Sequence, residues 1–318
     1  MDVKEIDSKL FTPGPLTTSM TVKQAMLHDL GSRDTVFINI VAHIRQKLLE
    51  IADASSDDYT AVLIQGSGTY AVEATFSTSV PQKNAKVLII ENGAYGQRMI
   101  KMCDILHIDY DTLSFSETEQ VNCKSVEEKL KSTKYTHVAV VHCETSSGIL
   151  NPIEQIAALV QQYGSDNTAF IVDSMSAFGA IPVSLKNGLI TFLISSANKC
   201  IEGIPGFAFV ICKRAYLLKC QGNSRSLALD LYDQYQYMEK SRQFRFTPPT
   251  HAIIAFKQAL DELEEEGQLI YPGKTTVTDC FRIGNIGRLY STDMEILAKC
   301  IKDVCVEMNI DLPLKNVD

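Results

Sequence analysis

The sequence lacks three features that would define its class at once: a block of clustered Lys and Arg, a CxxC pair, and an apolar run that could span a bilayer. Its 30 basic side chains are outnumbered by 38 acidic ones, so the formal net charge is −8. Nucleic-acid binding is therefore disfavoured, because neutralising phosphates requires clustered positive charge. An anionic substrate would have to be held by a few local cations, because the net negative charge of the protein repels it.

The nine cysteines are scattered along the chain, and their number is odd. This favours reduced thiols over a disulfide framework, and no ligand spacing indicates a metal site. The first ten residues, 1–10, contain no apolar signal core. With no apolar run long enough to cross a bilayer, we expect a cytoplasmic protein that has no membrane partner.

Short apolar runs alternate with helical patterns along most of the chain. Strands are predicted over 61–64, 86–90, 137–142, 169–173, 191–195 and 207–211. Continuous apolar strands separated by helices are typical of a mostly parallel α/β sheet that is covered by helices on both faces. Asn151 and Pro152 are typical of a helix start, with a capping residue before a proline in the first turn. Later patterns predict helices over 251–266 and 292–308.

Ligands of such sheets bind where loops leave the carboxyl ends of strands, and a glycine-rich turn follows the first predicted strand. In Gly66-Ser-Gly-Thr69, the glycines allow a phosphate to approach the backbone, and the N-terminus of the next helix supplies N–H donors. The hydroxyls of Ser67 and Thr69 could add hydrogen bonds. Taken alone, the pattern is equally consistent with an ordinary tight turn.

Two charged residues follow later strands. Asp173 ends the strand 169–173, and Lys199 comes just after the strand 191–195, among small residues. Asp173 alone could simply cap a turn, and Lys199 could extend from the surface into solvent. A lysine placed in an apolar setting can also have a lowered pKa and act as a nucleophile.

A phosphate site, a strand-end Asp and a strand-end Lys, in that order in an α/β chain, describe a pyridoxal-phosphate site. The glycine-rich turn would hold the phosphate, and Asp173 would keep the pyridine nitrogen protonated, so that the ring withdraws electrons. Lys199 would hold the cofactor as a Schiff base. Tyr95 could stack on the ring, although it could equally be a tyrosine on a surface loop.

Several motifs together resemble the class V aminotransferases of fold type I, and within them the 2-aminoethylphosphonate–pyruvate transaminase group. The matching segments are Thr12–Ser19, Met26–Asp34, Gln65–Thr69, Glu91–Arg98, His142–Pro152, Asp173–Gly179, Ser195–Gly206, Arg245–His251, Tyr271–Lys274 and Phe281–Gly287. The resemblance covers nearly the whole chain. It implies a large domain built on a mostly parallel, seven-stranded type of sheet, followed by a smaller α+β domain.

The resemblance also assigns residues by position. The cofactor-binding positions that it implies are Ser67, Gly68, Thr69, Tyr95, Thr145, Asp173, Lys199 and Thr247. Among these, Asp173 and Lys199 are the catalytic pair. Thr145 is implied to touch the ring oxygen, and Thr247 to reach the phosphate of a neighbouring subunit, which predicts a homodimer. Arg282 is implied to bind the anionic group of the substrate, which suits the planar fork of a guanidinium.

The chain departs from the family pattern after residue 266. In the family, several dozen residues separate the helix that ends in Leu-Glu-Glu-Glu-Gly from the Tyr-Pro-Gly-Lys segment, whereas here Gly267 is followed almost directly by Tyr271. The pattern indicates an internal deletion. We expect an N-terminal arm over 1–19, a large cofactor-binding domain over 20–266, and a truncated small domain over 267–318.

The resemblance implies an enzyme that transfers the amino group of 2-aminoethylphosphonate to pyruvate, a reaction of phosphonate catabolism. Two alternatives remain open. The chain could be another class V aminotransferase, such as one that uses alanine and glyoxylate. It could also be a catalytically inactive shortened form.

Overall fold

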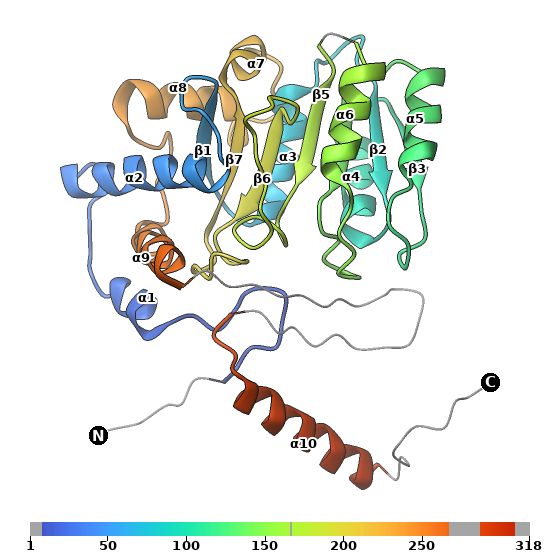
Figure 1. The fold of residues 1–318 in the computed structure, drawn as a ribbon. Helices are drawn as coiled ribbons and strands as arrows, with labels where there is room; N and C mark the ends of the chain where they lie inside the picture. Colours follow the sequence, from blue (N-terminus) through green and yellow to red (C-terminus); the bar gives the residue numbers. More distant parts are fainter. Residues whose placement is uncertain (1–7, 166, 267–286, 309–318) are drawn as a thin grey trace.

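The computed structural model describes residues 8–165, 167–266 and 287–308, and a seven-stranded sheet lies at the centre of that part of the chain (Figure 1). The strands are β1 Tyr59–Gln65, β2 Val87–Glu91, β3 Tyr110–Ser114, β4 His137–Val141, β5 Ala169–Asp173, β6 Phe192–Ser196 and β7 Phe207–Lys213. Their order across the sheet is β1-β7-β6-β5-β4-β2-β3. Each strand predicted from the sequence is present.

Strand β7 runs antiparallel to both of its neighbours, β1 and β6, and the other strand pairs are parallel. Because β7 reverses direction between them, β1 points the same way as β6. The carboxyl ends of β1, β2, β4, β5 and β6 therefore lie along one edge of the sheet, at the bottom of Figure 1. The predicted mostly parallel α/β architecture is confirmed.

The described helices are α1 Met20–Ala25, α2 Thr35–Ile51, α3 Gly68–Ser79, α4 Ala94–Ile105, α5 Cys123–Ser132, α6 Ile153–Tyr163, α7 Arg214–Lys219, α8 Leu231–Ser241, α9 Thr250–Glu266 and α10 Ser291–Glu307. Helices α3 and α4 lie behind the sheet in Figure 1, and α5 and α6 lie in front of it. All residues of β2, β4 and β5 are buried, because helices cover both faces of these strands.

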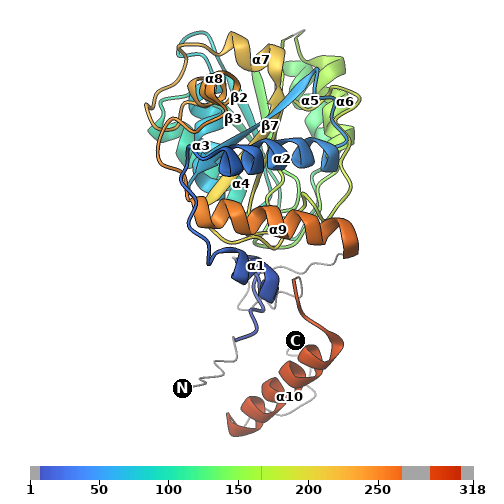
Figure 2. The same ribbon diagram turned by 90° about the vertical axis from the view of Figure 1, so that its left-hand side faces the viewer.

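Helix α9 covers the end of the sheet formed by β1 and β7, together with the neighbouring helix α2 (Figure 2). The Phe256 ring of α9 packs edge-on against Phe207 of β7, with ring centroids 5.0 Å apart. The ring centroid of Phe209, two residues along the same strand, lies 6.1 Å from that of Phe256. Residues two apart on a strand share a face, so this face of β7 presents an aromatic layer that anchors α9.

The start of α6 differs from the expected cap. Pro152 is the N-cap residue, and no side chain caps this helix. The Asn151 amide nitrogen instead donates hydrogen bonds to Asn92 Oδ1 and to the carbonyl of Val141. Asn151 is buried, and a buried amide has to satisfy its polar atoms where partners are available.

The C-terminal helix α10 has no buried residue and extends away from the sheet on the side of the N-terminal arm (Figure 1). It follows the predicted range closely. Most of the predicted small domain, 267–318, lies outside the described residues. Among the described helices, none is both long enough and apolar enough to cross a membrane.

Candidate active site

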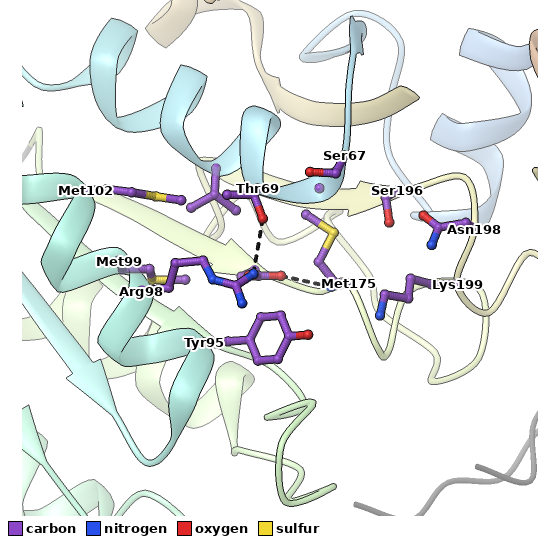
Figure 3. Close-up of a pocket in the computed structure, with 13 residues that line it drawn as sticks. Ser67, Thr69, Tyr95, Arg98, Met99, Met102, Met175, Ser196, Asn198 and Lys199 are labelled. Atoms are coloured by element: carbon purple, nitrogen blue, oxygen red, sulfur yellow. Dashed lines mark hydrogen bonds between the residues drawn. The ribbon is translucent and has the colours of Figure 1, made fainter. Parts of the chain in front are cut away.

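A cavity of about 190 Å³ lies at the carboxyl edge of the sheet (Figure 3). It is lined by Ser67, Gly68, Thr69, Val72, Tyr95, Arg98, Met99, Met102, Asp173, Met175, Ser196, Asn198 and Lys199. These residues come from separate stretches of the chain, each of which follows a strand or belongs to the helix after it. The structure thus brings Ser67, Gly68, Thr69, Tyr95, Asp173 and Lys199 together around one cavity.

The glycine-rich turn forms one wall of this cavity. Ser67 is the N-cap of α3, and its side chain makes no capping hydrogen bond. The Tyr70 N–H is bonded to the Ser67 carbonyl, so the donors that this turn offers to a ligand are the N–H groups before it, those of Gly68 and Thr69. Gly66 has φ +113°, and a Cβ atom there would lie 2.6 Å from the Tyr70 ring, so only glycine fits. A Cβ atom on Gly68 would lie 2.5 Å from the sulfur of Met175. The turn is therefore a close-fitting cradle with N–H donors, which suits a phosphate.

Asp173 lies at the end of β5 and is buried. Its Oδ1 accepts a hydrogen bond from the Met175 N–H at 3.0 Å. Burial raises the pKa of this carboxyl to about 7, because a charge is poorly solvated there. Among the described residues, none forms an ion pair with Asp173, and the charges of Lys199 and Arg98 lower its pKa by less than burial raises it. A cationic ring nitrogen in the cavity would provide a direct counter-charge.

Lys199 follows β6 by three residues and is only 9% exposed. Its carbonyl accepts the Glu202 N–H at 2.8 Å, which holds the turn that carries it. The N-terminal arm passes directly over its side chain, since a Cβ atom on Gly14 would lie 2.6 Å from Lys199 Cδ. Figure 3 shows Nζ directed into the cavity on the side of Tyr95. The arm thus covers the aliphatic part of the side chain and leaves the amine facing the cavity.

Tyr95 lies on the first turn of α4 and Arg98 at the start of the second, and both side chains border the cavity. The guanidinium carbon of Arg98 is 4.4 Å from the centroid of the Tyr95 ring. The Nη1 group of Arg98 donates a hydrogen bond to Thr69 Oγ1 at 3.1 Å. Arg98 belongs to the motif Glu91–Arg98, but the motif alone assigns it no role. Its spacing of three residues from Tyr95 on a helix was the available signal.

Two other predicted residues, Thr145 and Thr247, are not among the residues that line the cavity. The Thr145 hydroxyl is buried and hydrogen-bonded to the Ser176 hydroxyl at 2.6 Å. Thr247 is exposed, and its carbonyl accepts a hydrogen bond from Gln65 Nε2 at 3.2 Å. Arg282 lies outside the described residues. The roles proposed for these three residues stay predictions.

Glu144, to which the sequence alone assigns no role, fixes the start of α4. This fully buried side chain accepts hydrogen bonds from the backbone N–H groups of Tyr95 (3.3 Å) and Gly96 (3.4 Å) and from the Ser146 hydroxyl (2.7 Å). The N-cap residue of α4 is Gly93, which has no side chain that could cap the helix. A carboxylate from the β4–α6 loop thus serves as the cap and sets the position of Tyr95.

We predict that Glu144→Ala lowers the free energy of unfolding by about 1–3 kcal/mol, because the buried N–H groups lose their acceptor. It also weakens cofactor binding, since Tyr95 loses its fixed position. Urea denaturation and cofactor titration measure the two effects. The matched control is Glu128→Ala on the exposed face of α5, which should change stability by less than about 0.5 kcal/mol. Equal stability of the two variants would contradict the capping role.

Comparison with known proteins identifies the family. The sequence model of the family "Aminotransferase class-V" matches residues 18–270. A 2-aminoethylphosphonate–pyruvate transaminase of Bacteroides fragilis is 42% identical over 92% of this chain and 98% of its own length. The transaminase of the same name from Lysinibacillus sphaericus is 41% identical over 95% of this chain and 98% of its own length.

Solved structures have the same fold. The alanine–glyoxylate aminotransferase of Nostoc sp. superposes with a TM-score of 0.74 and 26% identity, covering 84% of this chain and 71% of that one. The pyridoxamine–pyruvate aminotransferase of Mesorhizobium loti gives a TM-score of 0.74 and 22% identity, covering 83% of this chain and 67% of that one.

The alignment with the Bacteroides fragilis relative spans 358 positions, more than the 318 residues of this chain. It therefore contains positions at which this chain has no residue, which agrees with a deletion but does not locate it. The family model covers most of the chain, and the cavity suits the pyridoxal phosphate that this family uses. The chain belongs to the class V aminotransferases, a family of pyridoxal-phosphate enzymes.

Proposed function

We propose that this chain transfers the amino group of 2-aminoethylphosphonate to pyruvate, giving phosphonoacetaldehyde and alanine. The supporting observation is that a helix N-terminus, the Asp173 carboxyl and the Lys199 amine all face one cavity. Relatives that are 41–42% identical over more than nine-tenths of this chain carry the name of this reaction. The overall charge is negative, so the anionic substrate needs a local cation; Arg282 is the residue proposed for this, from the resemblance alone.

When bound, pyridoxal phosphate supplies an aldehyde that condenses with amines and a ring that withdraws electrons from the substrate carbon. The first turn of α3, with Ser67, Gly68 and Thr69, binds the phosphate through backbone donors and hydroxyls. Tyr95 would pack against the ring. The contact of Thr145 with the ring oxygen is proposed from the resemblance alone, because its hydroxyl is bonded to Ser176 and is not among the groups that line the cavity. Asp173 holds a proton on the ring nitrogen.

Lys199 is the group that moves protons. Once freed from the cofactor, its Nζ would take a proton from the substrate carbon and give it to the neighbouring carbon of the cofactor, which requires an amine held within hydrogen-bond reach of both atoms. The arm residue Gly14 packs on its aliphatic part and limits the access of water from that side. Because the same site accepts the amino donor first and pyruvate second, we expect ping-pong kinetics.

The proposal also covers the oligomeric state of the protein, its domain boundaries and its cellular location. We propose a homodimer in which the exposed Thr247 reaches the phosphate of the neighbouring subunit, and a cytoplasmic location. We also propose the division into an arm (1–19), a large domain (20–266) and a truncated small domain (267–318). Analytical ultracentrifugation of the cofactor-loaded chain tests the dimer.

The matching fold of the alanine–glyoxylate aminotransferase favours a second candidate, in which alanine donates its amino group to glyoxylate. Side-by-side assays separate the two functions. We expect phosphonoacetaldehyde, detected by phosphorus NMR, when 2-aminoethylphosphonate and pyruvate are supplied, and turnover with alanine and glyoxylate slower by roughly tenfold or more. The reverse preference would favour the second candidate. A chain that neither captures the cofactor nor turns over either pair would favour an inactive shortened form.

A further inference from the structure

Arg98 is a cation on the cavity wall for which the proposed reaction has no role so far. It belongs to α4, whereas its hydrogen-bond partner Thr69 belongs to α3, so it joins two helices on one face of the sheet. Figure 3 shows its guanidinium between Thr69 and the ring of Tyr95. It therefore lies beside the turn that is proposed to hold the phosphate.

Within the part of the chain that the structure describes, most donors of this guanidinium have no hydrogen-bond partner. A guanidinium carries five N–H donors, and one of them serves Thr69. Within the described ranges, Arg98 forms no ion pair with a carboxylate, whereas Arg45, Arg214 and Arg288 each pair with a glutamate. The Tyr95 ring, 4.4 Å away, restricts where the guanidinium can lie. A preorganised cation with spare donors next to an anion cradle is the arrangement that binds a phosphate dianion.

We propose that Arg98 binds the phosphate of the cofactor, together with Ser67, Gly68 and Thr69 of the α3 turn. The inference rests on the proposed function, because it takes the ligand of the α3 turn to be the phosphate of pyridoxal phosphate. The half positive charge of a helix N-terminus offsets a dianion only in part. Arg98 supplies a full charge and donates directly to phosphate oxygens. Its side chain already contacts the Thr69 hydroxyl, one of the groups that line the same wall.

The test compares two ligands that differ only in the phosphate. Dissociation constants of pyridoxal phosphate and of pyridoxal are measured by absorbance titration for the full chain and for Arg98→Met. We expect Arg98→Met to weaken binding of pyridoxal phosphate by roughly tenfold or more, since a charge-assisted hydrogen bond is lost. Binding of pyridoxal should change by less than about twofold, because it has no phosphate to lose. Arg98→Lys, which keeps the charge, should restore part of the difference.

The matched control is Lys101→Met, which removes one positive charge from an exposed position on the same helix. It should leave both dissociation constants unchanged, and urea denaturation checks that every variant is folded. Equal weakening of both ligands by Arg98→Met would overturn the phosphate contact, because it would mean that Arg98 acts by positioning Tyr95. Tighter binding of both ligands would also overturn the phosphate contact, because it would mean that the guanidinium occupies the space that the cofactor ring needs. If the unaltered chain bound neither ligand, both the proposed function and this inference would fail.

Discussion

Lys199→Ala is expected to lower the turnover of 2-aminoethylphosphonate with pyruvate by at least roughly 10⁴-fold, the upper end of what one positioned acid–base group contributes. The loss is large because a single amine both attaches the cofactor and moves the proton between the two carbons. Other groups that line the cavity cannot replace it. Asp173 is the proposed partner of the ring nitrogen, and a guanidinium such as that of Arg98 has donors but no acceptor for a proton.

The rate of alanine formation measures the loss of turnover in Lys199→Ala. A second measurement identifies which lysine carries the cofactor. Reduction with borohydride followed by mass spectrometry of peptides should place one cofactor adduct on the peptide that contains Lys199. The matched control is Lys240→Ala, at an exposed position on α8, which should keep full turnover and the adduct. Residual turnover within tenfold of the original, or an adduct on a different lysine, would remove Lys199 from the centre of the mechanism.

The sheet could be predicted from the sequence because most of its strands are buried on both faces. In β4 and β5 every residue is buried, and both strands read as short continuous apolar runs. Strand β3 was missed because it lies at the edge of the sheet and carries the polar sequence Tyr-Asp-Thr-Leu-Ser, with each residue partly or fully exposed. Helix α2 was also missed, although Phe37, Val41, Ile44 and Leu48 recur at helical spacing and are buried.

The site was predictable only where a residue's role follows from its place after a strand. Asp173 and Lys199 could be singled out because each follows an apolar run directly, and parallel strands bring such ends to one edge. Glu144 and Arg98 act through partners on other elements: Glu144 reaches the backbone of α4, and Arg98 reaches α3. Such contacts depend on how helices pack around the sheet, and neither residue spacing nor composition specifies that packing.

Asp173→Asn is expected to lower kcat by roughly 10²- to 10³-fold, similar to the loss of one preorganised electrostatic group in other enzymes. The asparagine has nearly the same shape but no negative charge, so it cannot stabilise a proton on the ring nitrogen. Nitrogen-15 NMR of labelled cofactor measures that proton directly, and we expect it in the original chain but not in the variant. Asp57→Asn, at an exposed position, serves as the control and should keep both the proton and the turnover.

The same substitution predicts a change in how stability depends on pH. Burial raises the pKa of the Asp173 carboxyl from 3.8 to about 7. Between these values the folded chain without cofactor holds a proton that the unfolded chain has released. The free energy of unfolding therefore falls as the pH rises from about 4 to about 7. Asp173→Asn removes this titration, so urea denaturation should show a shallower fall over the same range. A bound cationic ring should also flatten it, because the nearby positive charge lowers the pKa of Asp173. If the variant kept both the original slope and a turnover within tenfold of the original, the buried carboxylate would not be the partner of the ring nitrogen.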